Sequence, residues 1–346
     1  MANKITVLMP VYNGKKYLRE AIESILEQTF ADFRFLIIND GSTDNSEEII
    51  KGYKDSRIRF LKNEKNLGLI STLNIGLKEA NGKYIARMDQ DDISFPNRLK
   101  LQYQFMESNP EIGISGTWIK KFGIKKSFIG KYYTTHDDLA AYLLFGCPFA
   151  HPTVIMRNEV MKKNGLFYDL NYQNAEDIAL WSQSVAFTKL ANLPKVLLYY
   201  RTHPNTISRK YTLEQYNAAN KVKLDLLKNI NLFPTDEELK IHSSFVDFDN
   251  DKKEFLNKTE VWLIKIIGAN KKSGVFNNKS LNKIISNRWL NICLTNANFG
   301  LYVWKKFWSS DLSREIKKND RLAIIKLFIK CLIKNNINII NIKNSA

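Results

Sequence analysis

The sequence predicts an α/β fold with a mostly parallel central sheet, flanked by helices and followed by a helical C-terminal extension. Three observations lead to this expectation. Short apolar runs alternate with amphipathic segments over the first 110 residues, the connections between them are short, and the pattern becomes helical and rich in Asn and Lys after about residue 210. Strand–helix alternation is typical of βαβ units, whose strands lie parallel in one sheet.

Each expected strand is a short apolar run bounded by polar or turn-forming residues. The first, ITVLMPV, contains Pro10 near its end and has the composition of a strand buried on both faces. FRFLIIND, IRFLKN and KYIARMD repeat this composition further along the chain. The four runs place strands at residues 5–11, 33–40, 58–63 and 83–89.

Helical periodicity fills the intervals between these strands. Leu18, Ile22 and Ile25 recur at helical spacing in the first interval. Ser42 begins a Ser-Thr-Asp run that offers N-cap chemistry for the next helix, and Gly82 follows an Asn at a typical helix stop. The expected helices cover residues 15–28, 42–53, 68–80 and 97–107.

The middle of the chain predicts a mixed extension of the sheet. Further strands are expected at 112–123, 126–133, 151–156 and 194–203, and helices at 136–146 and 174–187. The change in composition near residue 210 then divides the chain into a domain at 1–210 and a helical, basic region at 211–346.

Polar residues lie at the carboxyl ends of three of the expected strands. Tyr12 follows the first of these strands, Asp40 ends the second, and the acidic run 89–92 begins with the last residue of the fourth. Because ligands bind at the carboxyl ends of the strands in open parallel sheets, we expect these loops to converge on one site.

The run MDQDD crowds three carboxylates, Asp89, Asp91 and Asp92, into four positions. Like charges this close repel one another unless a cation is present. Mg²⁺ and Mn²⁺ prefer oxygen ligands, usually one or two carboxylates completed by substrate phosphates. The acids therefore indicate a divalent-metal site, or alternatively a helix start that is stabilised by acids through its dipole.

A second acidic pair, Glu176 and Asp177, begins the helix expected at 174–187. Adjacent acids at a helix start are ordinary capping chemistry. A carboxylate fixed on a helix end, across a cleft from a metal site, also suits a general base that takes the proton of an attacking hydroxyl. The residues alone leave both interpretations open.

Composition argues against several other classes of protein. Three widely spaced cysteines without a C-x-x-C pair indicate neither a zinc site nor a disulfide framework, and fit a reducing cytoplasm. The N-terminus lacks the apolar stretch of a signal peptide, and no run of about 18 apolar residues predicts a membrane-spanning helix. No nucleic-acid-binding module is recognisable, so we expect no nucleic-acid partner.

An ordered series of segments runs from about residue 4 to 208: VLMPVYNGKKYLREAIESILEQTF, FLIINDGSTDNS, NEKNLGLISTLNIGLKEANGKYIARMDQDD, HPTVIMR, NAEDIALW and YYRTHPNTIS. This series resembles the family 2 glycosyltransferases, inverting nucleotide-sugar enzymes with the GT-A fold. The resemblance implies that 1–210 is a Rossmann-like catalytic domain that uses Mn²⁺ or Mg²⁺. It implies transfer of a sugar from a nucleotide-diphosphate sugar, a UDP-sugar by resemblance, to a hydroxyl of a glycan or lipid-linked acceptor in cell-surface polysaccharide synthesis. A nucleotidyltransferase on a related sheet and an inactive nucleotide- or glycan-binding homologue are the competing interpretations.

The resemblance also assigns roles to individual residues. Asp177 would be the catalytic base, and Glu176 would orient the acceptor or the base. Asp91 would be the main metal ligand, with His203 as a further metal or diphosphate contact. The expected nucleotide-sugar-binding residues are Pro10, Val11, Tyr12, Asp40, Asn66, Gly68, Arg87 and Asp89.

Four further positions carry alternatives. Arg87 would contact the diphosphate or donor sugar, or else be a surface residue of its strand. Arg201 would pair with phosphate or hold its loop. Asp92 would support Asp91 or cap the next helix, and His151 is interpreted as a strand-end residue or one near the acceptor, outside the catalytic set.

The basic charge belongs mainly to the C-terminal quarter. Of a net charge of +17, residues 261–346 contribute 16 Lys and Arg against 3 Asp and Glu. Within it, RLAIIKLFIKCLIK (321–334) places Lys326, Lys330 and Lys334 on one side of an otherwise apolar helix. Such a helix either binds at an anionic membrane surface, here the inner face of the cell membrane, or packs its apolar face on the catalytic domain.

Overall fold

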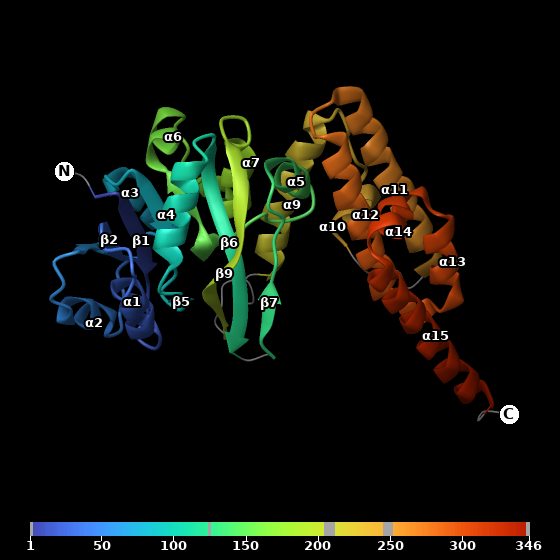
Figure 1. Cartoon of the computed structure of the whole chain (residues 1–346), viewed down its shortest axis with the longest axis horizontal. Helices are drawn as coiled ribbons and strands as arrows, with labels where there is room; N and C mark the ends of the chain where they lie inside the picture. Colours follow the sequence, from blue (N-terminus) through green and yellow to red (C-terminus); the bar gives the residue numbers. More distant parts are fainter. Residues whose placement is uncertain (1–2, 124–125, 204–211, 245–251, 344–346) are drawn as a thin grey trace. The chain divides into compact units, whose positions relative to one another are not determined.

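The computed structural model describes residues 3–123, 126–203, 212–244 and 252–343. The chain forms two compact units, Met1–Val222 and Lys223–Ala346. The first unit is an α/β structure and the second is built from helices (Figure 1). The boundary expected near residue 210 and the end of the YYRTHPNTIS segment, residues 204–208, lie outside the described residues.

Parallel strands form one half of the sheet in the first unit. β1 (Ile5–Val11) lies between β2 (Phe33–Asn39) and β4 (Tyr84–Arg87), and β3 (Ile58–Lys62) pairs with β2. The whole of β1 is buried, as expected for a strand covered on both faces. The connecting helices are α1 (Leu18–Leu26), α2 (Ser46–Gly52) and α3 (Leu69–Glu79).

Helix α3 lies directly against β1. At Gly76 an added Cβ would come within 2.2 Å of a Leu8 methyl carbon, so glycine permits this approach. The buried apolar core between sheet and helices includes side chains from β1, β2, β4 and α1. The predicted fold class, a Rossmann-like, mostly parallel sheet flanked by helices with a helical C-terminal part, is confirmed.

The other half of the sheet is mixed. Its first strand pairs antiparallel with β4, and the strand order in the described part of the chain is β3-β2-β1-β4-β8-β6-β9-β5, with β7 paired to β6. β6 and β9 run parallel to each other. These strands are β5 (Ile93–Ser94), β6 (Ile112–Gly123), β7 (Phe128–Gly130), β8 (Ile155–Arg157) and β9 (Lys189–Thr202), with helices α4 (Arg98–Ser108), α5 (His136–Tyr142), α6 (Asn158–Lys163) and α7 (Glu176–Ser184) around them.

The strand expected at 151–156 is partly wrong. Its first residues form a 3₁₀ turn, His151–Thr153, and the strand β8 begins only at Ile155. Pro152 has no N–H to give to a sheet ladder, and the Thr153 hydroxyl donates to the Ala150 carbonyl at 2.7 Å. This hydrogen bond closes the turn.

Other boundaries also differ from the expectation. β9 begins at Lys189 rather than 194, because the sheet absorbs Pro194 in an irregularity where β6 pairs first with Leu193 and then with Val196. The strand expected at 126–133 is limited to β7, and the helices expected at 136–146 and 174–187 end at Tyr142 and Ser184. β5 and α6 were not expected, since segments this short carry no clear period.

Helices make up the second unit. Thr235 and Glu238 form a reciprocal capping box at the start of α10. In the buried centre, Trp262 donates its indole N–H to His242 Nδ1 at 3.1 Å. Among the described residues, no helix is both long and apolar enough to cross a membrane. The helices from α9 onward are α9 (Thr212–Asn229), α10 (Asp236–Ser243), α11 (Lys252–Ser273), α12 (Asn278–Thr295), α13 (Leu301–Ser309), α14 (Arg314–Asn319) and α15 (Arg321–Lys343).

Candidate active site

The candidate site lies at the point where the order in which strands are added to the sheet reverses. From β1 the chain moves outward through β2 and β3, then returns to add β4 on the other side of β1. The carboxyl ends of β1 and β4 therefore mark the switch point of the sheet, where open α/β sheets bind ligands in a crevice.

Two loops at this crevice are joined by reciprocal hydrogen bonds. The backbone N–H of Tyr12, after β1, donates to Gln90 Oε1 at 2.9 Å, and Gln90 Nε2 donates back to the Tyr12 carbonyl at 3.0 Å. A Cβ at Gly14 would lie 2.4 Å from that Gln90 oxygen, so only glycine leaves room for it. Of the three residues at the end of β1 that were expected to bind the nucleotide-sugar, Pro10 and Val11 are buried within the strand and Tyr12 is exposed.

Asp40 organises the turn at 63–68. Its Oδ1 accepts hydrogen bonds from Asn63 Nδ2 (2.8 Å) and the Leu67 N–H (2.9 Å), and its Oδ2 accepts from the Gly68 N–H (3.0 Å). Asn66 Oδ1 also accepts from Gly68 N–H at 3.0 Å. Gly68 has φ +88°, which glycine adopts readily, and its Cα faces open space. The predicted Asp40, Asn66 and Gly68 are thus brought together at one edge of the crevice.

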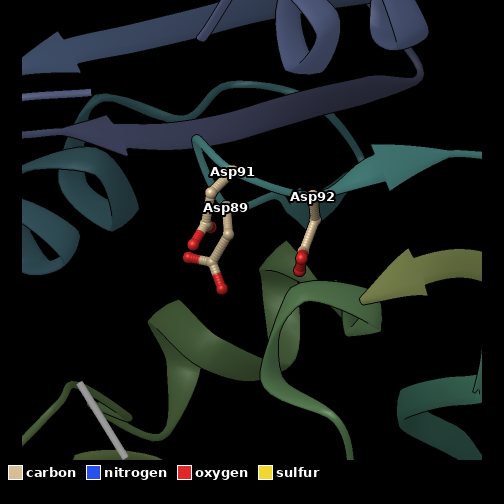
Figure 2. Close-up of side chains that lie close together, drawn as sticks. All are labelled: Asp89, Asp91 and Asp92. Atoms are coloured by element: carbon tan, nitrogen blue, oxygen red, sulfur yellow. The ribbon is translucent and has the colours of Figure 1, made fainter. Parts of the chain in front are cut away.

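Asp89, Asp91 and Asp92 gather in the loop after β4. Figure 2 shows their side chains projecting into the same space, and one carboxylate oxygen of each lies within 4.8 Å of the others. Asp92 is buried, whereas Asp89 and Asp91 are partly exposed. The sequence prediction that these acids cluster at the end of the fourth strand is confirmed by the geometry.

The chemistry of this cluster fits a divalent cation. Burial and the charges of Asp91 and Asp89 raise the pKa of Asp92 well above its usual value, and burial, opposed by Arg87, raises the pKa of Asp89. The buried Oδ2 of Asp92 has no hydrogen-bond partner in the described part of the chain. Carboxylate oxygens that repel one another this strongly would be stabilised as ligands of Mg²⁺ or Mn²⁺.

His203 reaches the cluster from the end of β9. Its Nε2 lies 2.8 Å from Asp91 Oδ2, and its ring packs 5.1 Å from that of Tyr17. The two residues expected to bind metal, Asp91 and His203, are therefore adjacent although they are 112 positions apart.

Arg201 holds the acidic loop in place. Its N–H donates to Asp92 Oδ1 and its Nε to the Asp91 carbonyl, both at 2.8 Å. The guanidinium lies between the rings of Tyr17 and Phe122, at 4.4 and 4.6 Å from their centres. Arg201 thus holds the acidic loop rather than its own, and the other role considered for it, pairing with phosphate, stays a prediction.

Arg87 is not a surface residue of its strand, which corrects that alternative. Its side chain is only 3% exposed and forms an ion pair with Asp89. The fully buried Arg98 fixes its backbone, donating from Nη2 to the Arg87 carbonyl at 2.6 Å. Within the described residues the buried Nε of Arg87 has no hydrogen-bond partner.

The acidic pair occupies the first turn of α7. Asn174 precedes it in the left-handed region (φ +64°), a conformation that Asn tolerates and that turns the chain into the helix. Asp177 Oδ1 accepts from the Ile178 N–H at 2.7 Å. Burial and the Asp177 carboxylate raise the pKa of Glu176 to about 7. Burial also raises the pKa of Asp177, opposed by its hydrogen bonds from Cys147 and the Ile178 N–H.

Sequence reasoning missed Cys147. Its thiol donates to Asp177 Oδ2 at 3.2 Å, and burial together with the Asp177 charge raises the thiol pKa well above its usual value. Cys147 therefore stays protonated and acts as a donor. A lone cysteine 30 positions before its partner gives no sequence signal.

Tyr168 and His151 form the wall beside the pair. Tyr168 Oη and His151 Nε2 are 2.8 Å apart, and Asn74 of α3 bonds both the N–H and the carbonyl of Tyr168 at 2.9 and 2.8 Å. The His151 ring also packs edge-on against Trp181 of α7. His151 is thus a packing residue in the 3₁₀ turn before β8, rather than the end of a strand, and its expected place near the acceptor stays a prediction.

Electrostatic interactions link the acidic cluster with the pair on α7. The Asp89 charge adds to the raised pKa of Glu176, and the buried Arg87 guanidinium opposes the pKa rise that burial causes at Asp177. The Asp89–Asp92 cluster, which suits a cation, and the Glu176–Asp177 pair, which suits proton transfer, therefore both interact with the buried Arg87. An α/β sheet with such a site at its switch point is what a glycosyltransferase requires.

The chain belongs to glycosyl transferase family 2, whose model matches residues 6–165. An uncharacterised glycosyltransferase of Haemophilus influenzae is 37% identical over 233 residues, which cover 63% of this chain and 72% of that protein. The O-antigen biosynthesis glycosyltransferase WbnJ of Escherichia coli is 34% identical over 235 residues, covering 65% of this chain and 89% of WbnJ. The family membership predicted from the sequence is confirmed.

Solved structures share the fold. TarS 1–349 of S. aureus, crystallised with UDP-GlcNAc, covers 88% of both chains with a TM-score of 0.58 and 18% identity. A mannosyltransferase of Pyrobaculum calidifontis, in complex with GDP-Man and Mn²⁺, covers 97% of this chain and 87% of its own, with a TM-score of 0.52 and 14% identity. The family membership makes the chain an enzyme of the glycosyltransferase class, and these structures share its fold.

Proposed function

We propose that the protein transfers a sugar from a UDP-sugar to a hydroxyl of a glycan or lipid-linked acceptor, with inversion at the anomeric carbon, in the cytoplasmic assembly of a cell-surface polysaccharide. The observation that carries the proposal is the placement of the Asp89–Asp92 cluster and the Glu176–Asp177 pair around Arg87. The polysaccharide context is supported by WbnJ, named for O-antigen biosynthesis, and the UDP nucleotide by the TarS complex.

The donor would bind along the crevice. The loops carrying Tyr12, Asp40 and Gly68 line the nucleoside end, and the acidic cluster lies at the diphosphate end. Arg87 brings a buried positive charge toward the donor, with its Nε not engaged by the described residues. A Mn²⁺ or Mg²⁺ ion held by Asp91 and His203 would neutralise negative charge on the departing diphosphate.

The transfer step is a direct displacement. Asp177 accepts the proton of the acceptor hydroxyl as that oxygen forms a bond to the anomeric carbon. The bond from this carbon to the diphosphate oxygen breaks, and its electron pair leaves with the nucleoside diphosphate. Cys147 and the Ile178 N–H hold the Asp177 carboxylate in place.

A screen of nucleotide sugars tests the proposal. The enzyme is incubated with UDP-, GDP- and dTDP-sugars in Mn²⁺ or Mg²⁺, and released nucleoside diphosphate is measured. We expect release from a UDP-sugar that EDTA abolishes and added metal restores. Release from GDP-sugars alone would overturn the UDP assignment. Binding without release would indicate an inactive homologue, and pyrophosphate from a nucleoside triphosphate and a sugar phosphate would indicate a nucleotidyltransferase.

The raised pKa of Glu176 predicts how stability depends on pH. Because this pKa lies near 7 in the folded protein and near 4.5 when unfolded, the folded state holds the extra proton between these values. The resulting stabilisation is complete below about pH 4.5 and is lost as the pH rises through 7. Glu176→Gln removes the effect, so its free energy of unfolding relative to wild type should rise by on the order of 2 kcal/mol from pH 5 to pH 8.

Urea denaturation at both pH values measures this difference. Glu27→Gln, which neutralises an exposed carboxylate at the end of α1, is the matched control and should show no such change. A constant difference between Glu176→Gln and wild type across the pH range would contradict the assigned titration.

A further inference from the structure

Over residues 321–333, the part of helix α15 whose side chains are described, one apolar face is packed and a second is exposed. Leu327 and Cys331 are fully buried, and the helix contacts α12, α13 and α14 of its own unit. This packing accounts for only part of the apolar sequence. A second set of large apolar side chains is exposed: Leu322, Ile325, Phe328, Ile329, Leu332 and Ile333.

These six residues form one continuous surface, which we call the α15 apolar arc. Successive side chains of an α-helix are rotated by about 100°, and on that geometry the six fall together on the side opposite Leu327. Leu322 is 79% exposed and Ile333 55% exposed. Exposure of these apolar side chains to water costs free energy, and such surfaces mark interaction sites.

Aromatic residues of α13 continue the arc. The Trp304 ring lies 4.8 Å from that of Phe328 and 5.5 Å from that of Trp308. Trp308 is 44% exposed, and Lys317 Nζ lies 5.1 Å from its ring centre. Tryptophan beside lysine is typical of side chains at a membrane–water interface.

The charges beside the α15 apolar arc indicate which kind of partner it binds. Lys326 and Lys330 are exposed at the border of the arc, and the α15 sequence from 321 to 343 contains basic residues but no Asp or Glu. A second copy of the chain would bring the same positive charges against these lysines. A phospholipid surface with anionic headgroups accepts both the apolar side chains and the lysines.

We propose that the α15 apolar arc docks in the surface of a bilayer that contains anionic phospholipid, with α15 lying along the interface. This inference rests on the second unit alone and does not depend on the proposed donor or acceptor. The sequence left open membrane binding and packing on the catalytic domain, and the proposal takes the first for the exposed face. The buried face packs on helices of its own unit, which the sequence did not predict.

Vesicle flotation of the full chain tests the proposal. The vesicles contain phosphatidylglycerol and phosphatidylcholine in equal parts, or phosphatidylcholine alone. We expect wild type to float with the anionic vesicles and to be released by salt. Lys326→Gln/Lys330→Gln should weaken that binding about thirtyfold, and Ile325→Glu/Ile329→Glu should abolish it.

A matched control changes two exposed aliphatic residues on another helix of the same unit, Val261→Glu/Ile264→Glu on α11, and should float like wild type. Circular dichroism melting checks that each variant is folded. Equal binding to both vesicle types, loss of binding in the α11 control, or no binding by wild type would overturn the proposal. So would a wild-type dimer, seen by light scattering, that Ile325→Glu/Ile329→Glu converts to a monomer without any vesicle binding.

Discussion

Replacing Asp177 with Asn is expected to lower the rate of sugar transfer by about 10³-fold while leaving donor binding unchanged. The amide cannot take up the acceptor proton. Asn has the shape of Asp, and its single amide oxygen can still accept from the Ile178 N–H, so the start of α7 should keep its structure. Its NH2 group then faces the Cys147 sulfur, which is a weak acceptor. The measurement is kcat for transfer together with the Kd of the nucleoside diphosphate by calorimetry.

Asp169→Asn provides the matched control for that variant. Asp169 caps a short 3₁₀ turn in the same segment, accepting from the Asn171 N–H at 2.8 Å, and Asn supports the same contact. Its transfer rate should equal that of wild type. Turnover by Asp177→Asn within a few-fold of wild type would show that another group accepts the proton.

The second large effect is expected at Asp91. Asp91→Ala removes the carboxylate next to His203 but leaves the Asp91 carbonyl bonded to Arg201, so the loop should persist. Loss of a ligand that helps to neutralise the diphosphate should lower kcat/KM by about 10²-fold or more and weaken Mn²⁺ binding. Mn²⁺ titrations followed by electron paramagnetic resonance and by activity measure the two effects.

Asp32→Ala is a suitable comparison for Asp91→Ala, since Asp32 forms a solvent-exposed ion pair with Lys4. It should leave both the Mn²⁺ affinity and the rate unchanged. If Asp91→Ala retained the wild-type dependence of activity on Mn²⁺ concentration, the placement of the cation at Asp91 would be wrong.

The parallel half of the sheet could be predicted from the sequence because each strand is a continuous apolar run. The period of the first helix, with Leu18, Ile22 and Ile25 on one face, was equally clear, and those three residues are buried in the structure. The mixed half was predicted less accurately. There, Pro152 and Pro194 interrupt the patterns, and the pairing of β9 with β6 depends on long-range contacts.

The acids of the candidate site could be located for a similar reason. Asp40 and Asp89–Asp92 follow strands directly, so the topology of the sheet brings their loops together. The environments of these residues could not be predicted. The burial of Arg87, the hydrogen bonds of Arg201 and the Cys147–Asp177 hydrogen bond depend on residues that are distant in the chain, up to 181 positions for Arg201 and Glu20. No local pattern records contacts of that kind, and the catalytic roles of these residues stay predictions.

The reciprocal hydrogen bonds between Tyr12 and Gln90 bear on how this enzyme could be re-engineered. These hydrogen bonds couple the loop after β1 to the loop after β4, and Gly14 leaves room for the Gln90 side chain that forms them. A library that varies residues near Tyr12 to accept another nucleotide would also displace the acids on the neighbouring loop. Donor preference and catalytic rate would then change together, so productive libraries should vary both loops at once.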